Sequence, residues 1–347
     1  MRQVWITGPG AVEVRDVPEP EPAAGELLVR TAYAGICGSD LHTLHRGHPW
    51  LPYPIPPGHE ASGVVAALGS GLSGWAEGDR VYLRPAVACG DCFYCGRNRP
   101  NLCANLIGVG SHRPGAFADA FAVPAAALAP VPDGVTLAAA AMTEPLATAV
   151  HATTVAAPGG RLDGATVAVL GGGSIGQCVL LAALAAGAAR VVVTDPVAAK
   201  RELALDLGAV AATDPSAPPA EEEIATALDG RPDVVFDCVA SRGSLGSALR
   251  LAMRGGTVVV VGVGHGPMDV TVEAVQDHEI RVCGSAMYVP DDFATAERLI
   301  GSGAPVHRLV TSVRPLADAP DALRAAAAGR DIKIHLAGPA ADTGGTR

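Results

Sequence analysis

Side chains able to ligate a metal gather early in the chain, between residues 37 and 60. Cys37 supplies a thiolate, His59 an imidazole, and Asp40 and Glu60 supply carboxylates. Such a mixed set of sulfur, nitrogen and oxygen donors suits zinc with one coordination position left open. Each residue alone has an ordinary role, since a single cysteine is often a small buried apolar side chain. Their combination within one short stretch predicts a reactive zinc site.

A second ligand set contains only cysteines, in the spacing C-x2-C-x2-C-x7-C: Cys89, Cys92, Cys95 and Cys103. Tight turns between the first three bring their sulfurs onto one ion, and the fourth completes a tetrahedron with no open position. An iron–sulfur cluster is the alternative, because ferredoxin sequences also begin with C-x2-C-x2-C, but they continue with C-x3-C-P. The longer gap favours a structural zinc that fastens this loop to the fold.

A glycine-rich turn opens the second half of the chain. It has the G-x-G-x-x-G pattern, and its residues are Gly171, Gly173, Ser174, Ile175 and Gly176. The apolar run 166–170 precedes it and a helical pattern follows, which is the setting that a dinucleotide-binding turn requires. Glycines allow backbone N–H groups at the helix N-terminus to approach a pyrophosphate. The turn therefore predicts a dinucleotide cofactor.

Asp195 follows the next apolar run, 190–194, at about 20 residues beyond the turn. A carboxylate at this spacing accepts hydrogen bonds from the adenosine ribose and repels a 2′-phosphate, which favours NAD over NADP. Lys200 and Arg201 are the nearest cations and are the main argument for NADP. A simple turn residue at a strand end is the alternative role for Asp195, but it does not explain the spacing.

The composition narrows the class of partner. The formal charge of −10 and the pI of about 5.4 argue against nucleic acid and anionic membranes, because either partner requires a basic surface. No run approaches the roughly 18 apolar residues that a membrane helix needs, and the N-terminus lacks the apolar core of a signal peptide. We therefore expect a cytoplasmic protein with reduced thiols that acts on a small molecule.

The elements that must position these residues differ between the two halves. Up to residue 83, short Val-rich runs broken by Pro and Gly predict a β-rich, barrel-like domain, with 41–57 as a loop beside a pocket. From residue 163 onward, apolar runs alternate with helical patterns, which predicts a doubly wound parallel sheet. The last segment carries two helical patterns and one strand.

The segment Cys37-Gly-Ser39-Asp40-Leu-His42, followed by Gly-His59-Glu60, closely resembles the catalytic-zinc signature of the zinc-dependent medium-chain alcohol and polyol dehydrogenases. The four-cysteine lobe and the glycine turn come in the order of that family, so the resemblance spans essentially the whole chain. It implies a GroES-like catalytic barrel plus a Rossmann domain. The implied domains are 1–147 (catalytic), 148–284 (NAD-binding) and 285–347 (a return to the catalytic domain).

The resemblance also implies a third zinc ligand. The stretch Met142-Thr-Glu144-Pro145-Leu matches the polyol branch, in which Glu144 takes the place of a second cysteine. Glu60 is an alternative ligand, because it binds the metal directly or in exchange with water in some relatives. A plain reading is available for Glu144, since an acidic residue in the first turn of a helix is favoured by the helix dipole.

Further roles follow from the family. Ser39 and His42 match the proton relay, and Val261 and Val263 match residues that line the nicotinamide. The implied reaction is zinc-dependent hydride transfer between a secondary alcohol or polyol and NAD, giving a ketone, in a homodimer or homotetramer. A primary-alcohol or formaldehyde-type dehydrogenase is one alternative, and a catalytically silent NAD-binding regulatory paralogue is another.

Overall fold

The computed structural model describes residues 1–48, 50–218, 220–264, 266–270 and 272–341. The chain divides into two compact units, which are described separately below. The first contains Met1–Glu144 together with Ile300–Arg347, and the second contains Pro145–Leu299.

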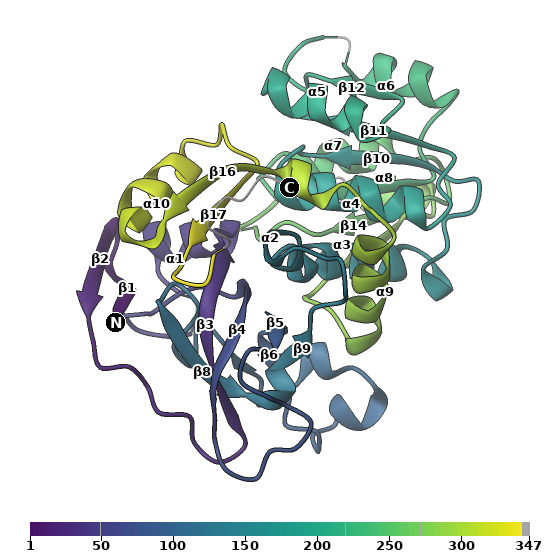
Figure 1. The fold of residues 1–347 in the computed structure, drawn as a ribbon. Helices are drawn as coiled ribbons and strands as arrows, with labels where there is room; N and C mark the ends of the chain where they lie inside the picture. The colour runs from purple at the N-terminus through teal and green to yellow at the C-terminus, as the bar shows by residue number, and fades with distance from the viewer. Residues whose placement is uncertain (49, 219, 265, 271, 342–347) are drawn as a thin grey trace. The chain divides into compact units, whose positions relative to one another are not determined.

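The first unit is built around a mixed sheet in which strands from both ends of the chain meet. The sheet order is β16-β17-β3-β4-β5-β9, with β8 also pairing with β3, while β1 pairs with β2 and β6 with β7. Figure 1 shows the C-terminal β17 beside β3, and the two strands pair in antiparallel fashion. The strands are β1 (Arg2–Gly8), β2 (Ala11–Asp16), β3 (Glu26–Gly35), β4 (Glu60–Leu68), β5 (Arg80–Leu83), β6 (Ala86–Val87), β7 (Ile107–Gly108), β8 (Ala120–Pro124), β9 (Leu128–Pro130), β16 (Val310–Pro315) and β17 (Lys333–Ala337).

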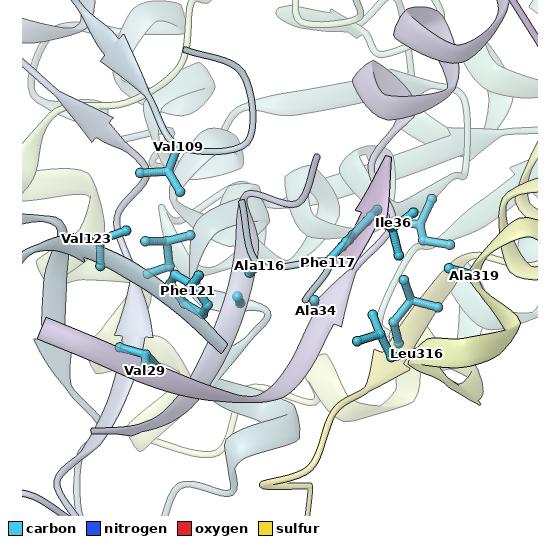
Figure 2. Packing of buried hydrophobic residues seen from close by; sticks show 14 of the residues in the cluster. Val29, Ala34, Ile36, Val109, Ala116, Phe117, Phe121, Val123, Leu316 and Ala319 are labelled. Atoms are coloured by element: carbon cyan, nitrogen blue, oxygen red, sulfur yellow. The ribbon is translucent and has the colours of Figure 1, made fainter. Parts of the chain in front are cut away.

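The core of this unit lies on both sides of β3 and includes residues that are far apart in the sequence. Figure 2 shows Val29 and Ala34 on β3, with Phe121 near one end and Leu316 near the other. These side chains are at most 2% exposed. Burial of apolar area on this scale is the main force that holds the C-terminal segment onto the N-terminal strands.

Helix α1 (Gly38–Arg46) corrects one expectation, because residues 41–57 were expected to form a loop. The carboxylate of Asp40 accepts a hydrogen bond from the N–H of Cys37 at 2.9 Å, which satisfies a donor at the start of the helix. Leu44 is buried on the inner face of α1, and the five prolines of the predicted loop all follow the helix. The other helices of this unit are α2 (Leu137–Ala140) and α10 (Ala319–Ala327).

The second unit has a six-stranded parallel sheet within its described residues, in the order β12-β11-β10-β13-β14-β15. Helices connect the strands. The strands that follow β10 are added first on one side of it, as β11 and β12, and then on its other side, as β13, β14 and β15. The strands are β10 (Thr166–Leu170), β11 (Arg190–Thr194), β12 (Ala211–Thr213), β13 (Val234–Asp237), β14 (Thr257–Val260) and β15 (Arg281–Gly284). The helices are α3 (Thr143–Ala156), which starts at the end of the first unit, α4 (Ser174–Ala185), α5 (Ala198–Asp206), α6 (Ala220–Leu228), α7 (Ser244–Leu251), α8 (Val272–Asp277) and α9 (Pro290–Gly301). In doubly wound sheets, ligands bind at the carboxyl ends of the strands where the order reverses, which here is the end of β10.

Across the described ranges, no helix combines the length and the apolar character needed to cross a membrane.

Candidate functional site

The proposed reactive site lies in the first unit, where two strand ends and a helix start meet. One ligand atom from each of Cys37, His59 and Glu60 lies within 4.8 Å of the others. Cys37 follows β3 and precedes α1, and Glu60 begins β4, whose register places it opposite Gly35 of β3. The paired ends of β3 and β4 therefore bring together residues that are separated by more than 20 positions in the sequence.

Asp40 lies beside this group rather than in it. Its Oδ1 atom is 3.6 Å from Nδ1 of His59, and its other oxygen caps α1 through the N–H of Cys37. Asp40 is 4% exposed. A carboxylate that faces one ring nitrogen of a metal-binding histidine fixes the orientation of the ring, so Asp40 supports His59.

Glu144 is buried in the first turn of α3, and its charge acts on His59. Within the described residues, however, the group whose ligand atoms lie within 4.8 Å of one another contains Glu60 and does not contain Glu144. The choice between these two carboxylates as the third ligand therefore remains a prediction.

The electrostatic environment of His59 favours a positive charge. Burial alone would lower the pKa of this imidazole. The carboxylate of Asp40, the thiol of Cys37 and the charge of Glu144 outweigh burial and raise the pKa of His59 well above its ordinary value. A divalent cation bound here would be stabilised by the same negative charges. Because the donor set consists of sulfur, nitrogen and oxygen atoms, it fits zinc.

The proposed proton relay occupies one face of α1. Ser39 and His42 are three residues apart, so both side chains lie on the same side of the helix. Oγ of Ser39 lies 3.4 Å from Nε2 of His59, and His42 is half-buried. The structure thus places Ser39 next to the proposed ligand set and His42 one turn further along the helix.

The four cysteines of the second ligand set converge as their spacing predicts. One sulfur from each lies within 4.8 Å of the others. Sγ of Cys103 is 3.4 Å from that of Cys89, and Sγ of Cys92 is 3.5 Å from that of Cys95 and 3.9 Å from that of Cys103. A disulfide requires about 2.05 Å, whereas two ligands on a tetrahedral zinc with bonds of about 2.3 Å lie roughly 3.8 Å apart. The distances therefore fit a metal site and exclude disulfide bonds.

Backbone N–H groups also point at these sulfurs. The N–H groups of Cys89 and Asn105 donate to Sγ of Cys103 at 3.3 and 3.4 Å. Hydrogen bonds from the backbone N–H groups of Cys95 and, to a smaller extent, Ala104 lower the pKa of Cys92 to about 6. The lowered pKa favours the thiolate form of Cys92, which is the form that binds zinc, whereas a hydrogen bond with the side chain of Asp91 raises the pKa of Cys89.

The glycine turn follows β10 and leads into α4. A Cβ atom added at Gly176 would lie 1.7 Å from the carbonyl oxygen of Gly171, and Gly171 itself has a φ of +93°. Apart from Gly173 itself and its two neighbours in the chain, no heavy atom of the described residues lies within 4 Å of the equivalent position at Gly173. The buried Oγ of Ser174, at the first position of α4, has no hydrogen-bond partner among the described residues. An open helix N-terminus with an unsatisfied hydroxyl fits a pyrophosphate.

Asp195 holds the turn in place. Its two carboxylate oxygens accept hydrogen bonds from the N–H groups of Gly172 at 2.9 Å and Val197 at 2.8 Å. Arg201 donates to the carbonyl oxygens of Asp195 and Pro196 and makes a 3.4 Å ion pair with Asp214. The predicted ribose-binding carboxylate therefore also links the end of β11 to the glycine turn.

Replacing Asp195 with alanine is expected to raise the KM for NAD by about tenfold and to reduce the preference for NAD over NADP, because a carboxylate that accepts from the ribose and repels a 2′-phosphate is lost. Initial rates with both cofactors measure the change. Asp214→Ala is the matched control, because it removes a nearby carboxylate that pairs with Arg201, which also donates to the backbone carbonyl oxygen of Asp195. An unchanged cofactor preference in Asp195→Ala would make Asp195 a turn residue only.

Val261 and Val263 follow β14. Val261 is half-buried, and its N–H donates to the carbonyl oxygen of Asp237 at 2.9 Å, while Val263 is 55% exposed. Their proposed role beside the nicotinamide remains a prediction.

One residue of the first unit was not expected from the sequence. Nζ of Lys333, on β17, lies 2.6 and 2.8 Å from the two carboxylate oxygens of Glu60. Burial alone would raise the pKa of Glu60, but the charges of Lys333 and His59 and the hydrogen bonds from Lys333 together outweigh burial and lower this pKa. The available signal was a lysine in a strand pattern whose other residues are apolar except His335, in a chain with just two lysines.

Comparison with known families identifies both halves of the chain. Residues 23–133 match the alcohol dehydrogenase GroES-like domain, and residues 174–302 match the zinc-binding dehydrogenase family. A 2-dehydro-3-deoxy-L-galactonate 5-dehydrogenase from Pseudoalteromonas atlantica is 34% identical over 86% of each chain. Human sorbitol dehydrogenase is 32% identical over 95% of this chain and 94% of its own.

Solved structures give the same result. A zinc-binding dehydrogenase from Sinorhizobium meliloti, bound to NADP, has a TM-score of 0.90 and 35% identity over 97% of this chain and 98% of its own. An alcohol dehydrogenase from Escherichia coli, complexed with NADH, has a TM-score of 0.89 and 29% identity over 97% and 99%.

These relatives confirm the expected fold class, a GroES-like domain with a Rossmann domain, and the expected chemistry, a zinc- and NAD-dependent oxidoreductase. The chain belongs to the zinc-dependent medium-chain alcohol and polyol dehydrogenases.

Proposed function

We propose that this protein oxidises a secondary hydroxyl group of a polyol or sugar acid to a ketone, with NAD as the hydride acceptor, and catalyses the reverse reduction. The observation that carries the proposal is the convergence of Cys37, His59 and the buried carboxylate of Glu60 within 4.8 Å, with the charge of the buried Glu144 acting on the same imidazole. The relatives named for galactonate, xylulose and sorbitol support this substrate class.

Each proposed site residue has a defined part. Cys37 and His59 hold the zinc with Glu144 as the third ligand, Glu60 being the alternative, and Asp40 keeps the His59 ring in place through its 3.6 Å contact. Zinc, when bound, acts as a Lewis acid on the substrate oxygen, and NAD supplies the hydride acceptor. Ser39 Oγ takes the hydroxyl proton and passes one outward to the imidazole of His42, because imidazole can both accept and donate a proton in catalysis.

The remaining residues assemble the other parts of the enzyme. Backbone N–H groups of the glycine turn, Ser174 and Ile175 bind the pyrophosphate of NAD, and Val261 and Val263 lie against the nicotinamide. A second zinc, held by the four-cysteine set, keeps its loop folded. These roles belong to a catalytic domain of residues 1–147 and 285–347 and an NAD-binding domain of residues 148–284.

A substrate panel tests the proposal directly. The protein with zinc and NAD is offered sugar alcohols, sugar acids, a vicinal diol, threonine and primary alcohols, and NADH formation is followed. We expect turnover on at least one secondary alcohol and a value of kcat/KM at least about tenfold lower on primary alcohols. Preference for a primary alcohol would support the first alternative. Two zincs per chain with no turnover on any alcohol would support the silent regulatory paralogue.

We also propose that the protein is cytoplasmic and forms a homodimer or homotetramer. None of the eight cysteines, all of which lie in the described ranges, forms a disulfide bond, which suits a reducing compartment. Strand β15 lies at the end of its sheet, and Val282 on it is 41% exposed. An exposed apolar edge strand offers unpaired backbone groups to another strand, so a second copy of this chain is the expected partner. Mass measurement in solution tests this, and a monomer at micromolar concentration would contradict it.

A further inference from the structure

A buried lysine lies next to the proposed zinc ligands without belonging to them. Lys333 is 2% exposed, Glu60 is fully buried, and the ammonium group contacts both carboxylate oxygens at 2.6 and 2.8 Å. Its third hydrogen bond goes to the carbonyl oxygen of Ile36 at 3.0 Å. Since a lysine ammonium has three donors, the side chain is held in a single position.

The backbone leaves space for this contact at one residue. Gly35 of β3 pairs with Glu60 on one side and with His335 on the other, so residue 35 lies between the two strands that carry the ion pair. A Cβ atom added at Gly35 would lie 2.2 Å from Oε2 of Glu60. Any side chain at this position would therefore displace the carboxylate from where Lys333 holds it.

A buried ion pair at this position is not expected to contribute much to the free energy of folding. Removing two charges from water costs about as much as their attraction returns, and apolar replacements of such pairs are often neutral or stabilising. Its position suggests another role, because one oxygen of Glu60 already lies within 4.8 Å of the ligand atoms of Cys37 and His59. Without Lys333, Glu60 would face only the imidazole of His59 and a metal ion bound beside it as positive partners in this group.

We propose that Lys333 is a positioning residue that withholds Glu60 from the zinc, so that Cys37, His59 and Glu144 are the protein ligands and one coordination position stays open for the substrate. This inference rests on the proposed function. Loss of the ammonium group frees Glu60 to become a fourth protein ligand, which converts an open, reactive site into a closed one.

Cobalt substitution at the Cys37 site tests the inference without an activity assay, because the visible spectrum of Co²⁺ depends on its ligands. Imidazole is the probe for an open coordination position. We expect imidazole to change the spectrum of the wild-type protein and to leave that of Lys333→Met unchanged. We also expect a chelator to remove zinc from this site of Lys333→Met at least about tenfold more slowly than from the same site of the wild-type protein.

Two further variants separate the positioning role from a structural one. The double variant with Glu60→Gln and Lys333→Met has no carboxylate at residue 60 that could bind the metal. Imidazole should therefore again change the cobalt spectrum of this variant. Gly35→Ala keeps the lysine but displaces the carboxylate, so it should behave like Lys333→Met, and it provides the test if Lys333→Met does not fold. An imidazole response in Lys333→Met or Gly35→Ala equal to that of the wild-type protein would overturn the inference. Fewer than two zincs per chain in the wild-type protein would instead contradict the proposed function.

Discussion

Cys37→Ala is expected to bind NAD and to keep the zinc of the four-cysteine set but to lose alcohol oxidation. Removing the thiolate leaves His59 and one carboxylate, which are too few ligands to retain a catalytic zinc. Lewis-acid stabilisation is worth several kcal/mol, so a loss of about 4 kcal/mol lowers turnover by roughly a thousandfold. Initial rates, zinc content and NAD binding measured on the same preparation check the three parts of this expectation.

The matched control is Cys283→Ala. Cys283 is a half-buried thiol on β15, away from both ligand sets in the sequence, and its removal should leave two zincs per chain and near-normal turnover. Full activity of Cys37→Ala would be incompatible with the proposed catalytic site. Loss of NAD binding in this variant would show instead that the substitution damages the fold.

The parts of the site that were predictable are those whose residues lie close together in the sequence. The first three cysteines of the second ligand set are separated by two residues each, and the glycine turn occupies six consecutive residues between a strand and a helix. Such motifs carry their geometry with them, because short spacings leave few ways to arrange the backbone. The apolar runs at 166–170 and 190–194 form strands with those same bounds, Thr166–Leu170 and Arg190–Thr194.

The parts that were not predictable depend on long-range pairing or on a local competition. Lys333 is 273 residues away from Glu60, and only the pairing of β17 with β3 brings the two together. In α1, the many prolines between residues 49 and 57 dominated the loop prediction. The helix forms before the first of them because Asp40 caps its N-terminus and Leu44 packs into the core.

The competition between Glu60 and Glu144 shows the limit of sequence patterns in physical terms. Both carboxylates are buried, and both follow from the family resemblance. The two carboxylates differ in their other contacts. Glu60 faces the ammonium group of Lys333, which no local sequence motif predicts. Ligand choice at such a site depends on the surrounding charges as much as on the ligands themselves.

Cys95→Ser is expected to destabilise the protein by removing the second zinc. Three thiolates bind zinc far more weakly than four, and structural zinc sites contribute their binding free energy to folding. We expect the free energy of unfolding to fall by about 3 kcal/mol or more and Tm to fall by roughly 10 °C. Thermal unfolding with and without added zinc, together with zinc content, measures the effect, and Cys283→Ser is the control. An unchanged Tm with two zincs per chain would show that Cys95 is not a ligand, and iron with visible absorption in the wild-type protein would favour the iron–sulfur alternative.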